Sequence, residues 1–531
     1  MAQRRQSFLT GAAVLTGAVA VTKVLGALYK IPLGNLLDSQ GMAHFYAAYN
    51  VYNLLLMLST AGLPLAASRL VAQAEALGRH GQSRRIFRCA LGLLGLVGLV
   101  FSALMALLPQ FMAALLHDPA ASSAIRVLAP SVLCVCLTSA IRGYTQGQNN
   151  MYPSAWSQVI EALGKLLIGL LAAGALLDRG LGVELGAAGA IFGVAVGTVL
   201  SLIYLLLWLL RHRRDDPPSA DRPESDGVLL RRILAVGIPI TLGATGMSLL
   251  NLLDQAVILG RLQDALGLAE KEAVALYGQY TFGHNLFNLP SSFIPPITMS
   301  LIPSVSAAIV RRDHRQINRI VSASLRLIAL FALPAGVGLS VLAGPILLLL
   351  YPAQPEAAAA ATYHLQLLGI ASIFVCLMLL TNSILQAHGR EQVPIVTMIV
   401  GGAVKVALNW FLVGDPNVGI QAAPISTLVC YALISVLNLA AVSRSVEQKP
   451  RYLSLFAKPL VCSVIMGFAA SAAYGLLQDL GNVAAVLSAI LFAVAVYVLL
   501  VLVLRVITRE DLLMLPKGEK IADLLHLKEF P

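Results

Sequence analysis

Charge is scarce in this chain. Only 12% of its 531 residues are Asp, Glu, Lys or Arg, about half of the roughly 25% that soluble globular proteins carry. A GxxxxGK[ST] phosphate-binding motif is also missing, which argues against a protein that hydrolyses ATP through a P-loop. The six cysteines all fall in apolar segments, and Cys134 and Cys136 point about 200° apart on a helix. We therefore expect small buried thiols rather than disulfides or metal ligands.

Long apolar runs take the place of charge. Hydrophobic residues make up 58% of the sequence, and the mean hydropathy is +0.80. Apolar runs of about 18 residues or more are typical of transmembrane helices. The first run extends from Phe8 to about Leu37, well beyond the 7–15-residue apolar core of a cleavable signal peptide. The composition therefore predicts an all-α membrane protein that crosses the bilayer many times.

Breaks at charged, proline or glycine residues divide the apolar sequence into fourteen expected spans. They cover residues 8–36, 44–68, 86–109, 122–144, 153–177, 186–210, 231–256, 274–301, 318–344, 360–386, 393–413, 420–443, 456–477 and 482–506. With a cytoplasmic N-terminus, 28 of the 37 Lys and Arg residues fall on the inner side, three in outer loops and six within spans. The positive-inside rule requires this asymmetry. We expect a multi-pass membrane protein with both termini in the cytoplasm, and the net charge of +11 then needs no nucleic acid to explain it.

The two halves of the chain resemble each other. Pro153 and Lys165 lie over Pro394 and Lys405 at offsets of 241 and 240 residues. A parallel repeat of two six-helix lobes around a central cavity is typical of alternating-access transporters, although plain duplication, as in a channel or scaffold, produces the same pattern. The expected regions are a first lobe at 1–211, a cytoplasmic linker at 212–230, a second lobe at 231–443, two further helices at 444–507 and a cytoplasmic tail at 508–531.

Three lysines are expected near the middle of the membrane. Lys23 lies about 22 Å along the first span, and Lys165 and Lys405 lie about 17–18 Å along the fifth and eleventh. Glu161 precedes Lys165 by one helical turn, so a structural ion pair is one interpretation of that lysine. Lys23 and Lys405 have no acid beside them on their own helices. Unpaired cations at this depth favour a hydrated cavity that accepts an anion, and pairing between helices is the alternative.

Amide and aromatic side chains accompany the lysines on other spans. Tyr49 and Asn53 lie in the second span, and His284 and Asn288 lie in the eighth. Rings and amides suit contact with a saccharide, whereas tyrosines near the membrane surface also act as plain anchors. Asp254, in the seventh span, either binds a coupling cation or is simply hydrated near the outer end.

Four stretches are similar to one known family. They are TGAAVLTGAVAVTKVLGALYKIPLGNLL, GLPLAASRLVAQAEALG, RGYTQGQNNMYPSAWSQVIEALGK and DLLMLPKGEK. They resemble the stage V sporulation protein B group of oligosaccharide flippases, within the multidrug/oligosaccharidyl-lipid/polysaccharide exporter superfamily. The resemblance implies a flippase for an undecaprenyl-pyrophosphate-linked saccharide, such as lipid II or a related cell-wall or polysaccharide unit.

The resemblance also implies roles for single residues. The KVLG stretch carries the cavity-lining basic position of related lipid II flippases onto Lys23, and Arg69 matches a basic position near the end of their second helix. Some of those flippases hold sodium between an acid on helix 7 and polar groups on helix 11. Asp254 and Asn409 match these positions, but Lys405 departs from the pattern. Sodium, protons or the membrane potential thus all stay open as the driving force, and we expect no other cofactor and no metal site.

Two other functions stay open at this point. A cation-coupled multidrug or organic-cation antiporter of the same superfamily would need an acidic cleft, whereas three lysines at mid-depth accompany the single acid Glu161. A glycan polymerase or acyltransferase would need a catalytic set on a loop, and the longest outer loop, about 257–273, carries acids without His or Ser beside them. We therefore expect a transporter and not an enzyme, acting as a monomer on a lipid-linked saccharide among membrane lipids.

Overall fold

The computed structural model describes residues 8–212, 221–294, 298, 301–302, 305–306, 308–309, 311–447, 450–504 and 506, with side chains at 14–15 and from residue 17 onward. Every regular element in these ranges is a helix. The expected tail at 508–531 and the middle of the expected linker, 213–220, lie outside the described residues. Pro295, Pro296 and Pro303 lie outside them as well.

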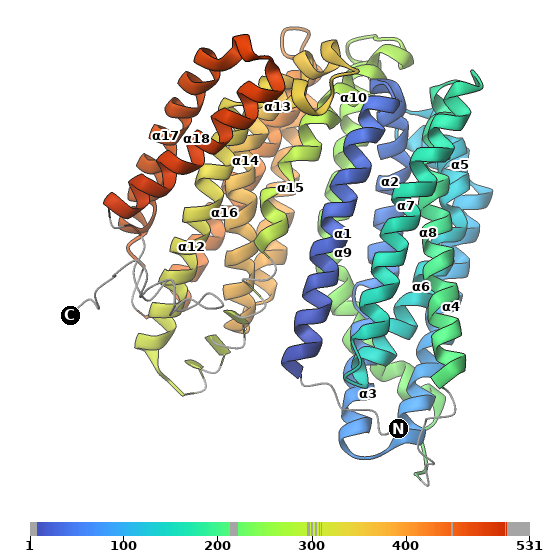
Figure 1. Cartoon of the computed structure of the whole chain (residues 1–531). Helices are drawn as coiled ribbons and strands as arrows, with labels where there is room; N and C mark the ends of the chain where they lie inside the picture. Colours follow the sequence, from blue (N-terminus) through green and yellow to red (C-terminus); the bar gives the residue numbers. More distant parts are fainter. Residues whose placement is uncertain are drawn as a thin grey trace. The chain divides into compact units, whose positions relative to one another are not determined.

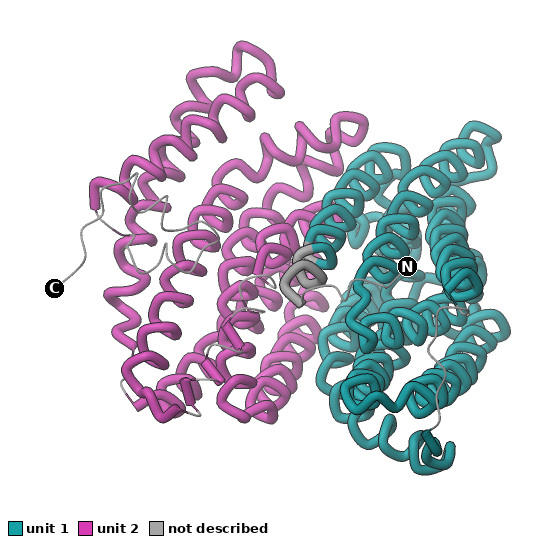
Figure 2. Tube along the Cα trace, turned by 60° about the horizontal axis from the view of Figure 1, so that its bottom comes forward, with its two compact units in different colours: residues 1–278 teal, residues 279–531 magenta. Residues whose placement is uncertain are grey.

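The first compact unit comprises residues 1–278, shown in teal in Figure 2. Its helices are α1 (Phe8–Leu36), α2 (Ser39–Thr60), α3 (Leu63–Ala76), α4 (His80–Leu107), α5 (Pro109–Leu115), η1 (Pro119–Ala121), α6 (Ser122–Gly147), α7 (Tyr152–Asp178), α8 (Val183–His212) and α9 (Asp226–Asp264). The unit also holds the start of α10 (Glu270–Phe287). Figure 1 labels these helices, apart from the short η1.

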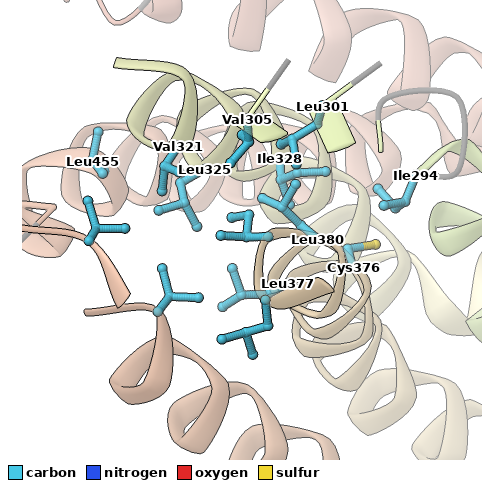
Figure 3. Close-up of a cluster of buried hydrophobic side chains, with 14 of the residues drawn as sticks. Ile294, Leu301, Val305, Val321, Leu325, Ile328, Cys376, Leu377, Leu380 and Leu455 are labelled. Atoms are coloured by element: carbon cyan, nitrogen blue, oxygen red, sulfur yellow. The ribbon is translucent and has the colours of Figure 1, made fainter. Parts of the chain in front are cut away.

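The second compact unit comprises residues 279–531, shown in magenta in Figure 2. Its helices are η3 (Pro290–Phe293), α12 (His314–Val341), α13 (Ala343–Leu350), α14 (Pro355–Ala387), α15 (Gln392–Leu412), η4 (Gly419–Gln421), α16 (Ala422–Ser445), α17 (Tyr452–Leu477), η5 (Gln478–Leu480) and α18 (Asn482–Val503). Figure 3 shows its apolar core, in which Val321, Leu325 and Ile328 of α12 pack with Leu377 and Leu380 of α14. Packing of complementary surfaces rather than burial from water holds such helices together within a bilayer.

The expected spans and the observed helices agree closely. Within the described residues, twelve segments are long and apolar enough to cross a membrane, and each coincides with one expected span. The two expected spans outside this set are occupied by α1, at 8–36, and by α10, which starts with three charged residues and covers only part of 274–301. An all-helical, multi-pass membrane protein is thus confirmed. The count of fourteen and the sidedness of the termini stay predictions.

The expected second span, 44–68, is broken into two helices. α2 ends at Thr60, α3 begins at Leu63, and Gly62 between them lies against α9. A Cβ atom on Gly62 would come within 2.0 Å of the carbonyl oxygen of Gly237, and the Gly62 N–H donates to Thr241 Oγ1 at 3.2 Å. The break therefore sits where only a residue without a side chain lets the α2–α3 joint touch the α9 backbone.

The packing of α9 differs from the expected division at the linker. α9 contacts α2, α3 and α4 and so belongs to the first compact unit, which ends at Gly278 rather than near residue 211. Grouping helices by packing and grouping them by internal repeat are different criteria, and the expected lobe boundaries therefore stay a prediction.

The cysteines also differ in part from expectation: all six are free thiols, but Cys89 and Cys134 are only half-buried.

Glycines bring α7 and α8 together closely. A Cβ atom on Gly193 of α8 would lie 2.2 Å from the Gly169 backbone of α7, and one on Gly197 would lie 2.5 Å from the carbonyl oxygen of Glu161. Small residues at such contacts let helix backbones approach each other within a membrane. The α7–α8 pair is therefore a closely packed support for the side chains that α7 carries.

Substitution of Gly193 by alanine is expected to destabilise the protein by about 1–3 kcal/mol, because the added methyl group meets backbone atoms that cannot move aside without separating α7 from α8. The apparent melting temperature of the purified protein in detergent measures this. Gly26→Ala is the matched control, since a Cβ atom there meets nothing within 4 Å. Equal melting temperatures for the two variants would show that the α7–α8 contact is not rigid.

Candidate functional site

Aromatic side chains of α1 and α2 gather within the first unit. The ring of Phe45 stacks on that of Tyr49 at 5.6 Å, and it meets the edge of Tyr29 at 6.0 Å. Tyr29 is fully buried and donates its hydroxyl proton to the carbonyl oxygen of Ala190 in α8 at 2.9 Å. Phe45 and Tyr49 are one helical turn apart on α2, so they present their rings on the same side. The two helices thus build a wall of rings whose orientation is held by stacking and by a hydrogen bond.

Lys165 reaches this aromatic wall from α7. Its Nζ donates to Tyr49 Oη at 3.0 Å and lies 4.5 Å from the centroid of the Tyr49 ring and 5.4 Å from that of Tyr29. An ammonium group within about 6 Å of a ring centroid is attracted by the negative face of the ring. We call Lys165, Tyr29, Phe45 and Tyr49 the lysine–aromatic cluster. It joins α1, α2 and α7 (labelled in Figure 1) about 20 Å along α7.

A second lysine extends the same arrangement. Lys30 of α1 holds its Nζ 5.0 Å from the centroid of the Tyr46 ring, and Tyr46 in turn meets Phe45 edge to face at 5.5 Å. The Lys30 side chain is thus turned toward α2, and two ammonium groups lie against connected aromatic rings.

The expected ion pair between Glu161 and Lys165 is wrong. Glu161 Oε2 is bound by Arg142 Nη2 at 2.8 Å, and no carboxylate in the described ranges forms an ion pair with Lys165. α6 continues to Gly147, so Arg142 lies inside that helix. Because Arg142 neutralises Glu161, the charge of Lys165 is left for another anion.

Arg142 was missed as a site residue, although helix pairing contains a signal for it. It lies five residues before the end of α6, and Ser157 lies five residues after the start of α7. Antiparallel neighbours joined by a short turn bring such positions together, and Arg142 Nε donates to Ser157 Oγ at 2.8 Å. Arg142 Nη2 also donates to Ser201 Oγ of α8 at 3.0 Å. The arginine thus ties three helices beneath the lysine–aromatic cluster.

Asp254 lies in a polar contact between α2 and α9. It is 5% exposed, and its neighbour Gln255 accepts a hydrogen bond from Asn50 Nδ2 at 2.7 Å. Gln255 Nε2 is buried and has no hydrogen-bond partner in the structure. Asn53, one turn after Asn50 on α2, is half-buried. Burial of Asp254 argues against the interpretation that it is simply hydrated, and its role as a ligand of a coupling cation stays a prediction.

Two basic residues that the family resemblance assigned to a cavity lie outside the lysine–aromatic cluster. Lys23 of α1 and Arg69 of α3 are both exposed, and neither forms an ion pair with a described residue. Val24, beside Lys23, is 60% exposed, whereas Thr22 is half-buried. Lys23 thus lies on a face of α1 that the described residues leave uncovered.

The remaining expected site residues lie in the second unit. Lys405 and Asn409, one turn apart on α15, are buried, and Ser426 Oγ donates to Asn409 Oδ1. Lys405 occupies the fourteenth position of α15, as Lys165 does in α7, so the repeat expected from sequence places both lysines at the same depth of their helices. Burial of Lys405 at 3% exposure differs from the open, hydrated position that we expected.

His284 and Asn288 have different environments. The His284 ring lies 5.7 Å from that of Tyr280 and 5.4 Å from that of Phe287, within an aromatic group of the second unit. Asn288 is exposed, and its carbonyl oxygen accepts hydrogen bonds from Ser291 and Ser292 at 2.9 Å each. Groups of three or more His, Cys, Asp or Glu side chains placed to hold a metal ion are absent from the described residues.

The local chemistry of the first unit suits an anion attached to a sugar. A lysine ammonium group has three N–H donors, and the hydrogen bond to Tyr49 occupies one of them. The other donors can bind phosphate oxygens, and the Tyr49 ring beside them is only half-buried. A cation without an acidic partner inside a membrane protein marks a site for a ligand.

Two relatives from Bacillus subtilis (strain 168) align along most of the chain. Stage V sporulation protein B is 26% identical over 530 residues, which cover 96% of this chain and 98% of that protein. Lipid II flippase MurJ is 25% identical over 486 residues, which cover 87% of each chain. The resemblance expected from the four sequence stretches is thus confirmed.

Solved structures of transporters have the same fold. Lipid II flippase MurJ in an inward closed conformation matches with a TM-score of 0.70 at 14% identity, covering 93% of this chain and 98% of that one. A multidrug resistance MATE family transporter of the MOP superfamily, in an inward-facing conformation, matches with a TM-score of 0.64 at 15% identity, covering 80% of this chain and 98% of that one. The relatives and solved structures whose names state an activity are a flippase and a transporter, not enzymes.

Two family models match the sequence directly. The MatE model matches residues 265–411. The model described as polysaccharide biosynthesis protein matches residues 8–309, which include the whole lysine–aromatic cluster. Since that match covers more than half of the chain, the protein belongs to the polysaccharide biosynthesis protein family.

Proposed function

We propose that this protein is a flippase that moves an undecaprenyl-pyrophosphate-linked saccharide, lipid II or a related cell-wall or polysaccharide precursor, across the plasma membrane. Membership of a polysaccharide biosynthesis family and likeness to a lipid II flippase support the substrate class. The observation that carries the proposal is the environment of Lys165. This cation within a membrane helix contacts two tyrosines, while the nearby acid Glu161 forms its ion pair with Arg142. A diphosphate is the anion that this substrate class supplies.

Different residues contact the diphosphate and the saccharide of the substrate. Lys165 binds the diphosphate, Lys23 and Arg69 attract it from exposed positions, and Lys405 provides the equivalent cation of the second repeat. The saccharide contacts Tyr49, Asn53, Glu161, His284 and Asn288. The prenyl chain stays in lipid while two repeated lobes alternate between inward-open and outward-open states. Asp254 and Asn409 are the positions for a coupling sodium ion or proton, and the membrane potential is the alternative driving force. The protein works as a monomer with both termini in the cytoplasm.

The test of the substrate uses the purified protein in liposomes. Fluorescent lipid II, undecaprenyl phosphate and a phosphatidylcholine are each placed in the inner leaflet, and the fraction that reaches an external quencher is measured over time. We expect lipid II to cross faster than in protein-free vesicles, because it carries both a diphosphate and a saccharide, and the other two lipids to cross at the protein-free rate. Equal acceleration of all three lipids would indicate a non-selective scramblase and contradict the proposal.

The buried acid Asp254 favours a second candidate function, a cation-coupled multidrug antiporter. It lies beside Gln255, whose side-chain nitrogen lacks a partner, and the MatE model matches part of the chain. A carboxylate of this kind can bind an organic cation. Efflux of a cationic dye by vesicles containing the wild-type protein, lost in Asp254→Asn while lipid II movement persists, would favour this candidate.

A further inference from the structure

Two histidine–carboxylate pairs meet at the turn between α5 and η1, residues 116–118. His44 of α2 contacts Asp118 of the turn, Nδ1 to Oδ1, at 2.7 Å. The neighbouring His117 contacts a different helix, and its Nε2 lies 3.7 Å from Oδ2 of Asp264, the last residue of α9. The turn thus offers an acid to α2 and a histidine to α9. It joins the two helices through contacts whose charge depends on protonation of a histidine.

The turn itself is formed by backbone contacts. Its N–H groups donate to the last turn of α5, His117 N to Ala114 O and Asp118 N to Ala113 O, at 3.0 Å each. His117 has a φ of +54°, a left-handed conformation that histidine, asparagine and aspartate adopt more often than other residues with side chains. Protonation of the histidines therefore changes what the turn holds rather than the shape of the turn.

The end of α9 is shaped to receive His117. A Cβ atom on Gly260 would lie 2.9 Å from His117 Cε1, so a glycine lets the ring lie against the helix. Gln263 Nε2 donates to the carbonyl oxygen of His117 at 2.7 Å. The contact between His117 and Asp264 is open to water, since their side chains are 36% and 72% exposed. Protons from the solution can therefore reach this pair directly.

The pair of His44 and Asp118 is nearly closed off from water. Their side chains are 7% and 0% exposed, and Asp118 Oδ2 has no hydrogen-bond partner among the described residues. A buried carboxylate with one partner gains most when that partner carries a positive charge. The charge on His44 therefore decides how strongly α2 holds the turn.

Acids surround His44. Besides Asp118, Glu184 of α8 and Asp38 at the start of α2 act on its ring electrostatically. The charged side chains in the outer halves of the other helices near α2 are Lys30 of α1, Arg126 of α6, Asp254, Arg261 and Asp264 of α9, and Glu270, Lys271 and Glu272 of α10. α5 carries none, and the charged residues of α3 and α4 lie toward their opposite ends. The field at the His44 ring is therefore set by carboxylates.

The charge pattern of the sequence predicts on which side of the membrane the turn lies. With a cytoplasmic N-terminus, the start of α2, the end of α9 and the loop between the third and fourth expected spans are all outside. α2 lies in the first half of the expected repeat, and α9 begins the second half. In alternating access the outer ends of the two halves separate when the outward-open state forms. A contact that joins α2 to α9 at this end opposes that separation.

We propose that the turn at residues 116–118 is a proton-controlled clamp that holds the outer ends of α2 and α9 together. When His44 and His117 are protonated, both pairs are ion pairs and the two helices are tied through the turn. When the rings are neutral, His44 gives Asp118 only a hydrogen bond, and His117 is no longer attracted to Asp264 by charge. Acid outside the membrane therefore closes the clamp, and it opens as the pH rises through about 5 to 8, where histidine loses its charge.

The test is hydrogen–deuterium exchange of the full-length protein in nanodiscs at about pH 5.5 and about pH 8. The measured quantity is the protection factor, which corrects for the direct effect of pH on the exchange chemistry. We expect residues 113–121 and 260–264 to be about tenfold better protected in acid, because a hydrogen bond to a charged partner is worth more than one between neutral groups by a factor of this order. Exchange requires no substrate, so the result is independent of whether the protein moves lipid II.

The variant H44N/H117N removes both titrating rings. Asparagine Nδ2 takes the place of the His44 Nδ1 donor toward Asp118, and asparagine tolerates the left-handed conformation of residue 117. We expect this variant to have equal protection factors at the two pH values. His80→Asn is the matched control, because His80 Nδ1 lies 2.8 Å from Glu75 Oε2 in a similar pair between α3 and α4. It should keep the wild-type pH effect at the turn.

His117→Asn alone changes only a half-exposed ring and covers the case in which the double variant is unstable. It should lose the pH effect at residues 260–264 and keep part of it at residues 113–121, where His44 still titrates. A wild-type protein with equal protection at both pH values would overturn the proposal. So would a pH effect of wild-type size at residues 260–264 in H117N, or at the turn in a folded H44N/H117N.

Discussion

Replacement of Lys165 by glutamine is expected to reduce movement of lipid II in liposomes at least about tenfold, with the protein still folded. The ammonium group has no carboxylate partner among the described residues, and its nearest contacts are Tyr49 and Tyr29. Its removal therefore leaves no buried acid unpaired. Loss of a charge that pairs with a desolvated phosphate costs 2 kcal/mol or more. The initial rate of quencher access to labelled lipid II is the measurement.

Three further variants separate charge from packing at this site. Lys165→Arg keeps the charge and should retain part of the activity. Tyr49→Phe keeps the ring but removes the hydroxyl that accepts from Lys165, so its activity measures what this hydrogen bond contributes. Arg126→Gln removes an exposed cation of α6 outside the cluster and should transport as the wild type does. If Lys165→Gln and Arg126→Gln are equally active, Lys165 does not bind the substrate.

Replacement of His44 by leucine is expected to produce the largest loss of stability. His44 Nδ1 lies 2.7 Å from Asp118 Oδ1, and the side chains are 7% and 0% exposed. Asp118 Oδ2 has no hydrogen-bond partner among the described residues, and His44 is the partner of Oδ1, so the leucine would leave a buried carboxylate without any partner. Breaking a buried pair in this way costs about 3–5 kcal/mol. A fall of several degrees in the apparent melting temperature in detergent is the expected result.

The partner substitution shows whether the effect comes from buried charge. Asp118→Asn keeps an oxygen for the hydrogen bond to His44 and carries no charge, so its loss of stability should be smaller, on the order of 1 kcal/mol. The double variant H44L/D118N removes the unpaired charge and should be more stable than H44L alone. A double variant that melts below both single variants would assign the effect to packing of the space that His44 fills.

Depth in the membrane could be read from the sequence because it follows from counting residues. Lys165 and Lys405 occupy the fourteenth positions of their helices in the structure, and the expected helix starts were at most one residue away. Long apolar runs can form only helices in a bilayer, where every backbone polar group needs a partner within its own segment. The approximate positions of the long helices therefore followed from the runs, whereas several helix ends differ from the expected ones by several residues.

Partner choice could not be read in the same way. Glu161 lies one turn from Lys165, which suggested a pair on one helix, yet it binds Arg142 of α6. A lysine and a glutamate on one helix stabilise each other by only a few tenths of a kcal/mol, so a better-placed arginine on a neighbouring helix forms the ion pair with the glutamate instead. Likewise, the pairing of His44 with Asp118 joins residues 74 positions apart, beyond the reach of any local pattern.

The sequence by itself determined that this is an all-helical, multi-pass membrane protein, about where its long helices lie, and which family it resembles. These properties depend on composition and on the order of residues along one chain. Only the tertiary structure decided that Lys165 lies against Tyr29 and Tyr49 and that Arg142 satisfies Glu161. These facts depend on which faces of different helices meet. That choice is made by side-chain fit across helix contacts, such as the close approach of α7 and α8 at Gly193, and no period along the sequence records it.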